Sequence, residues 1–317
     1  MASESETLRR DAVLREIRDA RFTHGVFCPH CAASRCQRWG GFSGRQRYRC
    51  TQCRRTFSDL TATPAAYLKR LEQFSEYRSC MRASISVRRA GALLGVSKDT
   101  TFRWRHRLLF HVRRCDPVQL RGYTEVADWR FAHSAKGRST HHPRQRGLRW
   151  APLHRPSVWV SFVTDRLGGA AAAITGNRRP GAAGLRFGLE RFIGTDVILI
   201  TAGPRLSGHA TFATMLDLAV HCRARARHGT ELPHTRTVTR YIAEFRSWLK
   251  PFLGVSTRYL ENYLTWFSVL RRAEREHAGV QFLHWPVPPP LPTIPADTAR
   301  GLARQQSSGL PPNEALQ

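Results

Sequence analysis

Two pairs of cysteines have the clearest spacing for chemistry. Cys28-Pro-His-Cys31 and Cys50-Thr-Gln-Cys53 are separated by 18 residues. Each pair can form a tight knuckle that places two thiolates on one side of a tetrahedral zinc ion. Four thiolates leave no coordination position for water, so the predicted Zn²⁺ is structural rather than catalytic. Because the segment has little core, metal binding should supply most of its folding free energy.

The other candidate ligands lack this spacing. His30 lies inside the first knuckle and could replace a thiolate, although a histidine there is more often a surface residue. Cys36 lies between the pairs but belongs to neither. Three isolated cysteines are expected to be buried small apolar residues, namely Cys80, Cys115 and Cys222.

Arginines surround the second cysteine pair. They alternate with Tyr48 on a predicted hairpin and continue after Cys53. A guanidinium matches the oxygens of a phosphate, so these residues could contact a DNA backbone. The alternative is a solvated charged hairpin. The candidate DNA-binding residues here are Arg45, Arg47, Arg49, Arg54 and Arg55.

Residues 84–110 have the pattern of a helix-turn-helix. A first helix over 86–94 would turn Ala90, Leu93 and Leu94 inward, and Gly95-Val96-Ser97 would supply a left-handed C-cap and the next N-cap. A second helix over 98–110 would bury Phe102, Leu108 and Leu109. Its N-terminal part would enter the major groove with Lys98, Thr100, Thr101, Arg103 and Arg105. An ordinary helical hairpin fits the same spacing.

The composition favours a polyanionic partner. Lysine and arginine number 51 against 23 acidic residues, which gives a formal charge of +28. Nucleic acid is the commonest partner for such a charge, and an anionic membrane surface or a GC-rich genome are the competing explanations. However, no stretch of about 18 apolar residues can span a bilayer, and no signal-peptide pattern opens the sequence. Eight cysteines with this spacing favour metal in a reducing compartment, so we expect a cytoplasmic, nucleoid-associated protein.

Periodicity divides the chain into modules of different types. Strands are predicted at 123–131, 157–164, 169–175 and 196–201, and helices at 181–193, 206–220, 234–250 and 256–275. Tyr259, Tyr263 and Trp266 have the spacing of a buried helix face. The basic segment 134–156 should be an exposed loop. The predicted units are a polar leader over 1–22, a small β zinc ribbon over 23–60, a helical region over 64–114, a mixed α/β domain over 120–275, and a Pro-rich disordered tail over 285–317.

The order of motifs resembles a known family. CPHC, GRQRYRCTQCRRTFSDLTATP, the helix-turn-helix, EVADWRFAHSAKG and LKPFLGVSTRYLENYLTWF follow one another over roughly 25–275. Together they resemble bacterial insertion-sequence transposases with a zinc ribbon, a helix-turn-helix and an ISXO2-like DDE domain. The resemblance implies a ribonuclease-H-like mixed sheet with flanking helices and binding to double-stranded DNA at terminal inverted repeats. It also implies homo-oligomers on DNA, and Mg²⁺ in active relatives.

The residues that hold the metals in that family are missing here. Transferred residue by residue, the three carboxylate positions fall on Ala127, Ala202 and Thr239. Neighbouring acids should not substitute, because Asp128 points to the other face of its strand, while Asp196 and Glu244 are displaced along the chain. Methyl and hydroxyl groups do not hold Mg²⁺, which needs anionic oxygen ligands.

The expected function is therefore DNA binding without strand cleavage. Lys136, in the family's Ser-x-Lys-Gly motif after the first strand, could steady a phosphate or be an ordinary loop lysine. Two alternatives remain open at this point. One is an active transposase with displaced ligands, and the other is a transcriptional regulator that uses only the zinc ribbon and the helix-turn-helix.

Overall fold

The computed structural model describes residues 4–23, 25–42, 44–115, 118–135, 157–201, 207–222 and 234–275. The predictions for Ala202, Lys136 and the tail 285–317 lie outside the described residues. The described chain divides into two compact units, residues 4–75 and 76–275.

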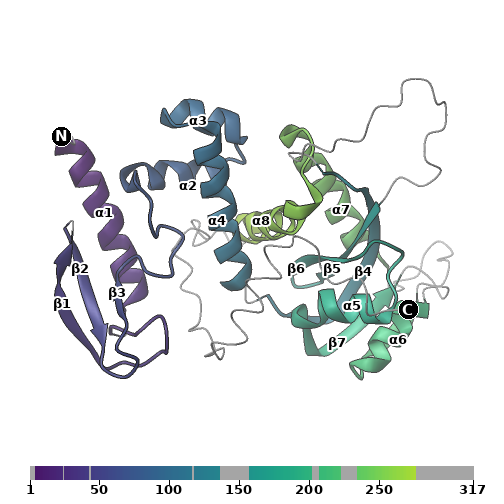
Figure 1. The fold of residues 1–317 in the computed structure, drawn as a ribbon. Helices are drawn as coiled ribbons and strands as arrows, with labels where there is room; N and C mark the ends of the chain where they lie inside the picture. Colours follow the sequence, from purple (N-terminus) through teal and green to yellow (C-terminus); the bar gives the residue numbers. More distant parts are fainter. Residues whose placement is uncertain are drawn as a thin grey trace, which may run out of the picture. The chain divides into compact units, whose positions relative to one another are not determined.

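The first unit contains a three-stranded antiparallel sheet and a helix (Figure 1). Strands β1 (Cys36–Phe42), β2 (Arg45–Cys50) and β3 (Thr56–Ser58) follow one another in the order β1-β2-β3. Tyr48 pairs with Phe57 in the register, and their rings stack at 5.4 Å between centroids. These rings pack with Cys28 and Cys50 in a small core. The predicted short strands of this region are confirmed.

The first 22 residues are more than a polar leader. Residues Glu4–Arg21 form helix α1, which buries Val13, Leu14 and Ile17. The Arg18 guanidinium lies 2.7 Å from the carboxylate of Asp59, a fully buried residue just after β3. The expectation of a separate leader is therefore corrected, because three apolar side chains and an ion pair hold α1 against the rest of the unit.

The second unit begins with three helices, α2 (Phe74–Arg82), α3 (Val87–Leu94) and α4 (Lys98–Cys115). The first two residues of α2 belong to the first unit. Ser86 caps α3 and Ser97 caps α4, since each hydroxyl accepts a backbone N–H three residues later. Gly95 ends α3 in the left-handed conformation, with a φ of 61°. Gly91 allows a close turn, because a Cβ there would lie 2.8 Å from the Val96 carbonyl oxygen.

These helices match the predicted helix-turn-helix elements, although several side chains face other directions than expected and Phe102 is half-buried rather than buried. Ala90 and Leu94 are buried as expected, but the side chain of Leu93 is 61% exposed. Leu93 lies on the outer face of α3, because only one of two adjacent leucines on a helix can face its partner.

A five-stranded mixed sheet forms the centre of the second unit. Its strands are β4 (Leu120–Ala132), β5 (Ser157–Asp165), β6 (Ala170–Gly176), β7 (Ile193–Thr201) and β8 (Ala219–Cys222). The order is β6-β5-β4-β7-β8. The β6–β5 and β5–β4 pairs are antiparallel, and the β4–β7 and β7–β8 pairs are parallel. The predicted mixed sheet with interleaved helices is confirmed. Strand β8 was missed, since the expected helix 206–220 ends at Met215.

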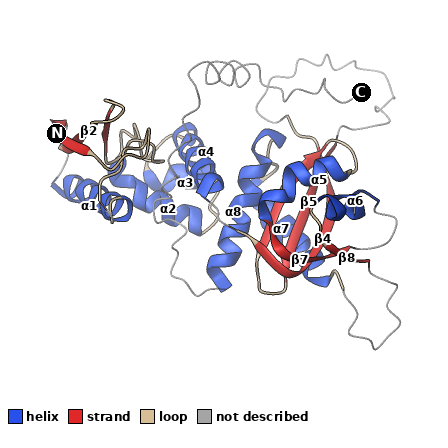
Figure 2. Cartoon of the chain, turned by 90° about the horizontal axis from the view of Figure 1, so that it is seen from below, coloured by secondary structure: helices blue, strands red, loops and turns tan. Residues whose placement is uncertain are grey.

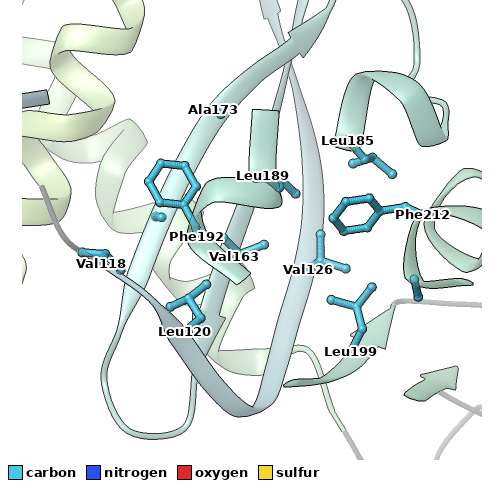
Figure 3. Close-up of a cluster of buried hydrophobic side chains, with 12 residues drawn as sticks. Val118, Leu120, Val126, Val163, Ala173, Leu185, Leu189, Phe192, Leu199 and Phe212 are labelled. Carbon is cyan, nitrogen blue, oxygen red and sulfur yellow. The ribbon is translucent and has the colours of Figure 1, made fainter. Parts of the chain in front are cut away.

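Helices cover both faces of the sheet (Figure 2). On one face lie α5 (Ala182–Leu189), the short helix η2 (Glu190–Phe192) and α6 (Ser207–Met215), and their side chains pack against Val126 and Leu199 of the strands (Figure 3). On the other lie α7 (Arg236–Leu249) and α8 (Thr257–Arg275), which enclose Phe162, and the short helix η3 (Lys250–Phe252) follows α7 directly. None of the described helices combines the length and the apolar character needed to cross a bilayer.

Candidate metal centre and nucleic-acid interface

The four paired cysteines converge on one point of the first unit. Their sulfur atoms all lie within 4.8 Å of one another. The Cys28 and Cys53 sulfurs are 3.6 Å apart, as are those of Cys31 and Cys50. The knuckles place them there, because the backbone N–H of His30 points at the Cys28 sulfur and that of Cys53 at the Cys50 sulfur.

Electrostatics explains why this cluster needs a cation. Burial raises the pKa of the Cys28 thiol to about 12. Burial also opposes ionisation of Cys50, but the backbone N–H groups of Cys53 and Gln52 outweigh it and lower that pKa to about 6. Four thiolates at this separation would repel one another, whereas a tetrahedral dication neutralises them. The donor set and its spacing therefore fit Zn²⁺.

The neighbouring candidates lie outside the cluster. The Cys36 sulfur donates to the Ala33 carbonyl oxygen at 3.5 Å, and the ring of His30 does not join the four sulfurs. Cys80 is buried, as expected for a small apolar residue. The side chains of Cys115 and Cys222 are not among those described.

The arginines of β2 share one side of the small sheet. Alternation turns Tyr48 and Cys50 into the core and leaves Arg45, Arg47 and Arg49 half-buried on the opposite face. The Arg49 guanidinium lies 4.6 Å from the ring centre of Trp39, an exposed side chain of β1. Tyr48, which alternates with these arginines in the sequence, is a core residue. Arg54 and Arg55 are exposed.

Helix α4 exposes only part of the set assigned to DNA. Lys98 and Arg103 are exposed and Thr100 is half-buried. Thr101 is fully buried and its hydroxyl donates to the Val87 carbonyl oxygen at 2.8 Å, which joins α4 to α3. Arg105 is only 1% exposed. The expectation that Thr101 and Arg105 face DNA is therefore corrected, because both lie on the inner side of α4.

Arg105 lies between α4 and α8 instead. Its guanidinium donates to the Ile85 carbonyl oxygen and to the Tyr263 hydroxyl, and it lies 4.9 Å from the ring centre of Trp266. One turn of α8 earlier, the ring of Tyr259 stacks on His106 at 3.9 Å. Tyr263 and Trp266 are buried as predicted, and Tyr259 is half-buried. The Arg113 and Glu261 side chains add an ion pair between the two helices.

Ala127, the first expected carboxylate position, lies in an apolar environment. It packs against the cluster that contains Phe162 and Val238. Two residues earlier on the same face, Glu125 is fully buried, and its carboxylate accepts the Val238 N–H at 2.9 Å. Arg166 and His234 each have a nitrogen 3.3 Å from the same carboxylate. Sequence reasoning missed Glu125. Its position two residues before Ala127 places both on one face of the strand, and this spacing could have identified it.

Asp128 points to the opposite face of β4, as strand alternation predicted. Its carboxylate accepts the Ser161 hydroxyl at 2.6 Å and lies 3.3 Å from Nε2 of His209 on α6. His209 is 1% exposed, so this polar group is enclosed between the sheet and α6. The pairing of Asp128 with a histidine 81 positions later was not visible in the sequence.

The remaining positions around α7 hold no spare carboxylate. Thr239 is exposed, and its hydroxyl donates to the Thr235 carbonyl oxygen at 2.7 Å. Glu244 pairs with Arg271 at 2.8 Å and faces Arg240. Asp165 accepts the Gly169 N–H at 2.6 Å within the β5–β6 turn. Within the ranges that the structure describes, the cysteine cluster is the sole group of three or more potential ligands that converge.

Comparison with solved structures finds complexes of a transposase. The Mos1 strand transfer complex matches at 13% identity, over 64% of this chain and 75% of that chain, with a TM-score of 0.23. The Mos1 paired-end complex with the left transposon end matches at 13% identity, over 63% and 76%, with a TM-score of 0.21. TM-scores of this size do not place individual residues.

Comparison of the sequences finds a more extensive similarity. No protein-family model matches the chain. An uncharacterized protein in transposable element ISH50 of Halobacterium salinarum is 28% identical over 267 residues, which cover 81% of this chain and 88% of the relative. Over most of its length, then, the chain is similar to a protein carried by a transposable element.

Proposed function

We propose that this chain is a transposase-type protein that binds double-stranded DNA without cleaving it. The similarity to a protein of a transposable element, the net charge of +28 and the strand order of the mixed sheet all support this assignment. The zinc-binding sheet and the exposed start of α4 would contact the DNA, which we expect to be the terminal repeats of the element. The proposed contacts include Arg49, Lys98 and Arg103.

The observation that carries the loss of cleavage is the environment of Ala127. Cleavage by two metal ions needs convergent carboxylates, and Mg²⁺ requires anionic oxygen ligands. Here a methyl group packs into an apolar cluster, and Thr239 is an exposed alcohol. On the same face of β4, the Glu125 carboxylate accepts a backbone N–H and lies 3.3 Å from nitrogens of Arg166 and His234, which would compete with a metal ion for it. The residues present therefore do not fit a catalytic metal pair.

A nicking assay with terminal-repeat DNA tests this proposal. The unsubstituted chain should shift the DNA in a gel and leave both strands intact in Mg²⁺ or Mn²⁺. Robust metal-dependent nicking would overturn the loss of cleavage. In that case Glu125→Gln would show whether the buried carboxylate acts as a displaced ligand.

A second variant supplies the matched comparison. Replacing Ala127→Asp, Ala202→Asp and Thr239→Glu restores the three acidic positions that the resemblance implies. We expect Mn²⁺ to raise the Tm of this variant, because a ligand that binds only the folded state stabilises it. Mn²⁺ should leave the Tm of the unsubstituted protein unchanged. An equal Mn²⁺ response from both proteins would contradict the proposal.

A further inference from the structure

A cleft of about 350 Å³ lies beside the C-terminal half of β4, between that strand and α7. This volume falls at the lower end of the range for sites that take a small organic ligand. Its lining residues come from the strand, the second half of α7 and the start of η3. They are Phe131, Ala243, Arg246, Ser247, Leu249 and Lys250.

The floor of the cleft is apolar and held by the core. Phe131 and Leu249 are half-buried and pack against the cluster that contains Phe245. The rings of Phe131 and Phe245 meet edge to face at 6.0 Å between centroids. The floor is therefore rigid, and Phe131 presents part of its surface to the cleft.

The rim of the cleft is cationic. Arg246 and Lys250 are both exposed, four residues apart on consecutive helical turns. Neither has a carboxylate partner among the described residues. The Arg246 guanidinium lies 4.2 Å from the ring centre of Trp129, a surface side chain on the same face of β4 as Phe131. The aromatic ring thus keeps the cation near the cleft.

We infer that this cleft binds one unpaired nucleotide of a DNA strand. A base can lie against the apolar floor only if its faces are free of stacked neighbours and its edge is free of a pairing partner. Aromatic contact with such a base and cationic contact with the adjoining phosphate are the two interactions used for single-stranded nucleic acid. The inference rests on the proposed function, since it takes DNA as the ligand.

The cleft lies on the face of β4 that also carries Ala127. Ala127, Trp129 and Phe131 alternate along one face of β4. Phe131 lies four residue steps beyond Ala127, or about 13 Å along the strand. An unpaired nucleotide in the cleft would therefore lie on the same face of β4 as the position where the resemblance puts the first metal-binding carboxylate, at about that distance. The cleft would hold a frayed or single-stranded DNA end there, whether or not cleavage follows.

Binding measurements with matched DNA probes test the inference. The full chain is titrated by fluorescence anisotropy against a blunt duplex, the same duplex with a five-nucleotide single-stranded extension, and that extension with abasic sites. The unsubstituted protein should bind the extended duplex about 5- to 150-fold more tightly than the blunt one, because one stacked base contributes about 1–3 kcal/mol. Abasic sites should remove most of this preference.

Three variants separate the cleft from general charge effects. The double variant Arg246→Ala, Lys250→Ala and the single variant Ala243→Trp, which fills the cleft without removing a charge, should each lose the preference for the extension. Arg240→Ala removes an arginine from the same helix outside the cleft and should keep the preference. Blunt-duplex affinity should change little in Ala243→Trp.

The outcomes distinguish this inference from the proposed function. Equal binding of blunt and extended duplexes by the unsubstituted protein would overturn the cleft assignment and leave duplex binding intact. The cleft assignment would also be overturned if Ala243→Trp kept the preference for the extended duplex. The same holds if Arg240→Ala lost this preference as fully as the cleft variants. Failure to bind the blunt duplex would contradict the proposed function alone, because binding of the extension and its loss in Ala243→Trp can still be measured.

Discussion

The guanidinium of Arg105 on α4 donates to the hydroxyl of Tyr263 on α8 across 3.4 Å. This contact joins two helices that are 158 positions apart at these residues. The same guanidinium also satisfies the Ile85 carbonyl oxygen and lies against Trp266. A charged side chain that sequence patterning assigns to DNA therefore stabilises the interior of the second unit.

Arg105→Ala should destabilise the second unit by about 2–4 kcal/mol, because it leaves a buried carbonyl unpaired and opens a cavity. Arg103→Ala, on the exposed side of the same helix, should change stability by less than about 0.5 kcal/mol and weaken DNA binding. Urea unfolding and DNA anisotropy on both variants check this. A stable Arg105→Ala protein with selectively weakened DNA binding would contradict the buried placement.

The zinc content of the protein should depend on the four clustered cysteines and not on Cys36, which lies between the two pairs in the sequence. The unsubstituted protein should contain about one zinc ion per chain, and Cys28→Ser should lose it and unfold the β1–β3 sheet, since metal binding supplies folding free energy there. Cys36→Ser is the matched control and should retain the metal. Atomic absorption and circular dichroism are the measurements, and equal zinc loss in both variants would refute the ligand set.

Stability should fall in mild acid because of His106. Burial, with Arg105 and Arg258 nearby, lowers the pKa of this histidine to about 4 from an ordinary 6.5. Between these values the unfolded chain binds a proton that the folded protein does not, so stability falls as pH decreases from about 6.5 to about 4. Titration of His106 can change the free energy of unfolding by at most about 1.4 kcal/mol per pH unit.

The contribution of His106 can be isolated by substitution. His106→Gln should flatten the pH dependence of unfolding in that window relative to the unsubstituted protein. Urea unfolding at pH 7 and pH 5 measures the difference. If the two proteins lose the same stability between these pH values, His106 is not the responsible group.

The ion pair between α1 and the small sheet should hold that helix in place. Asp59 is fully buried, so Asp59→Ala should cost about 1–3 kcal/mol by leaving the Arg18 guanidinium without its buried acceptor. Asp11→Ala removes an exposed partner of Arg10 on the same helix and should cost under about 1 kcal/mol. Hydrogen exchange of the β2 and β3 amides reports the change. Unaltered protection in Asp59→Ala would show that the pair is dispensable.

Local patterns predicted much of this architecture. The cysteine ligands depend on spacing within each knuckle, and the caps at Gly95 and Ser97 depend on neighbouring residues, so both could be read directly. The strands of the mixed sheet also matched, because alternation and β-branched residues mark them. Strand β8 has only four residues, which is too short for a period to be recognised.

Long-range contacts explain the errors. The inner face of α4 includes Thr101 and Arg105, both polar, because α3 and α8 supply their partners. The buried state of Glu125 depends on a backbone N–H 113 positions later. Likewise, charge dominates the composition of residues 1–22 and indicates a polar leader, whereas three apolar residues at helical spacing decide the packing of α1. Such partners cannot be inferred from the residue types alone.

The packing of α4 against α8 limits how this protein could be shortened. A fragment that ended at residue 115 would leave the surface formed by Phe102, Arg105 and His106 in water, without the helix that normally covers it. Such a product would tend to aggregate rather than persist as a compact domain. The DNA binding proposed for α4 would therefore depend on the presence of the last helix of the second unit.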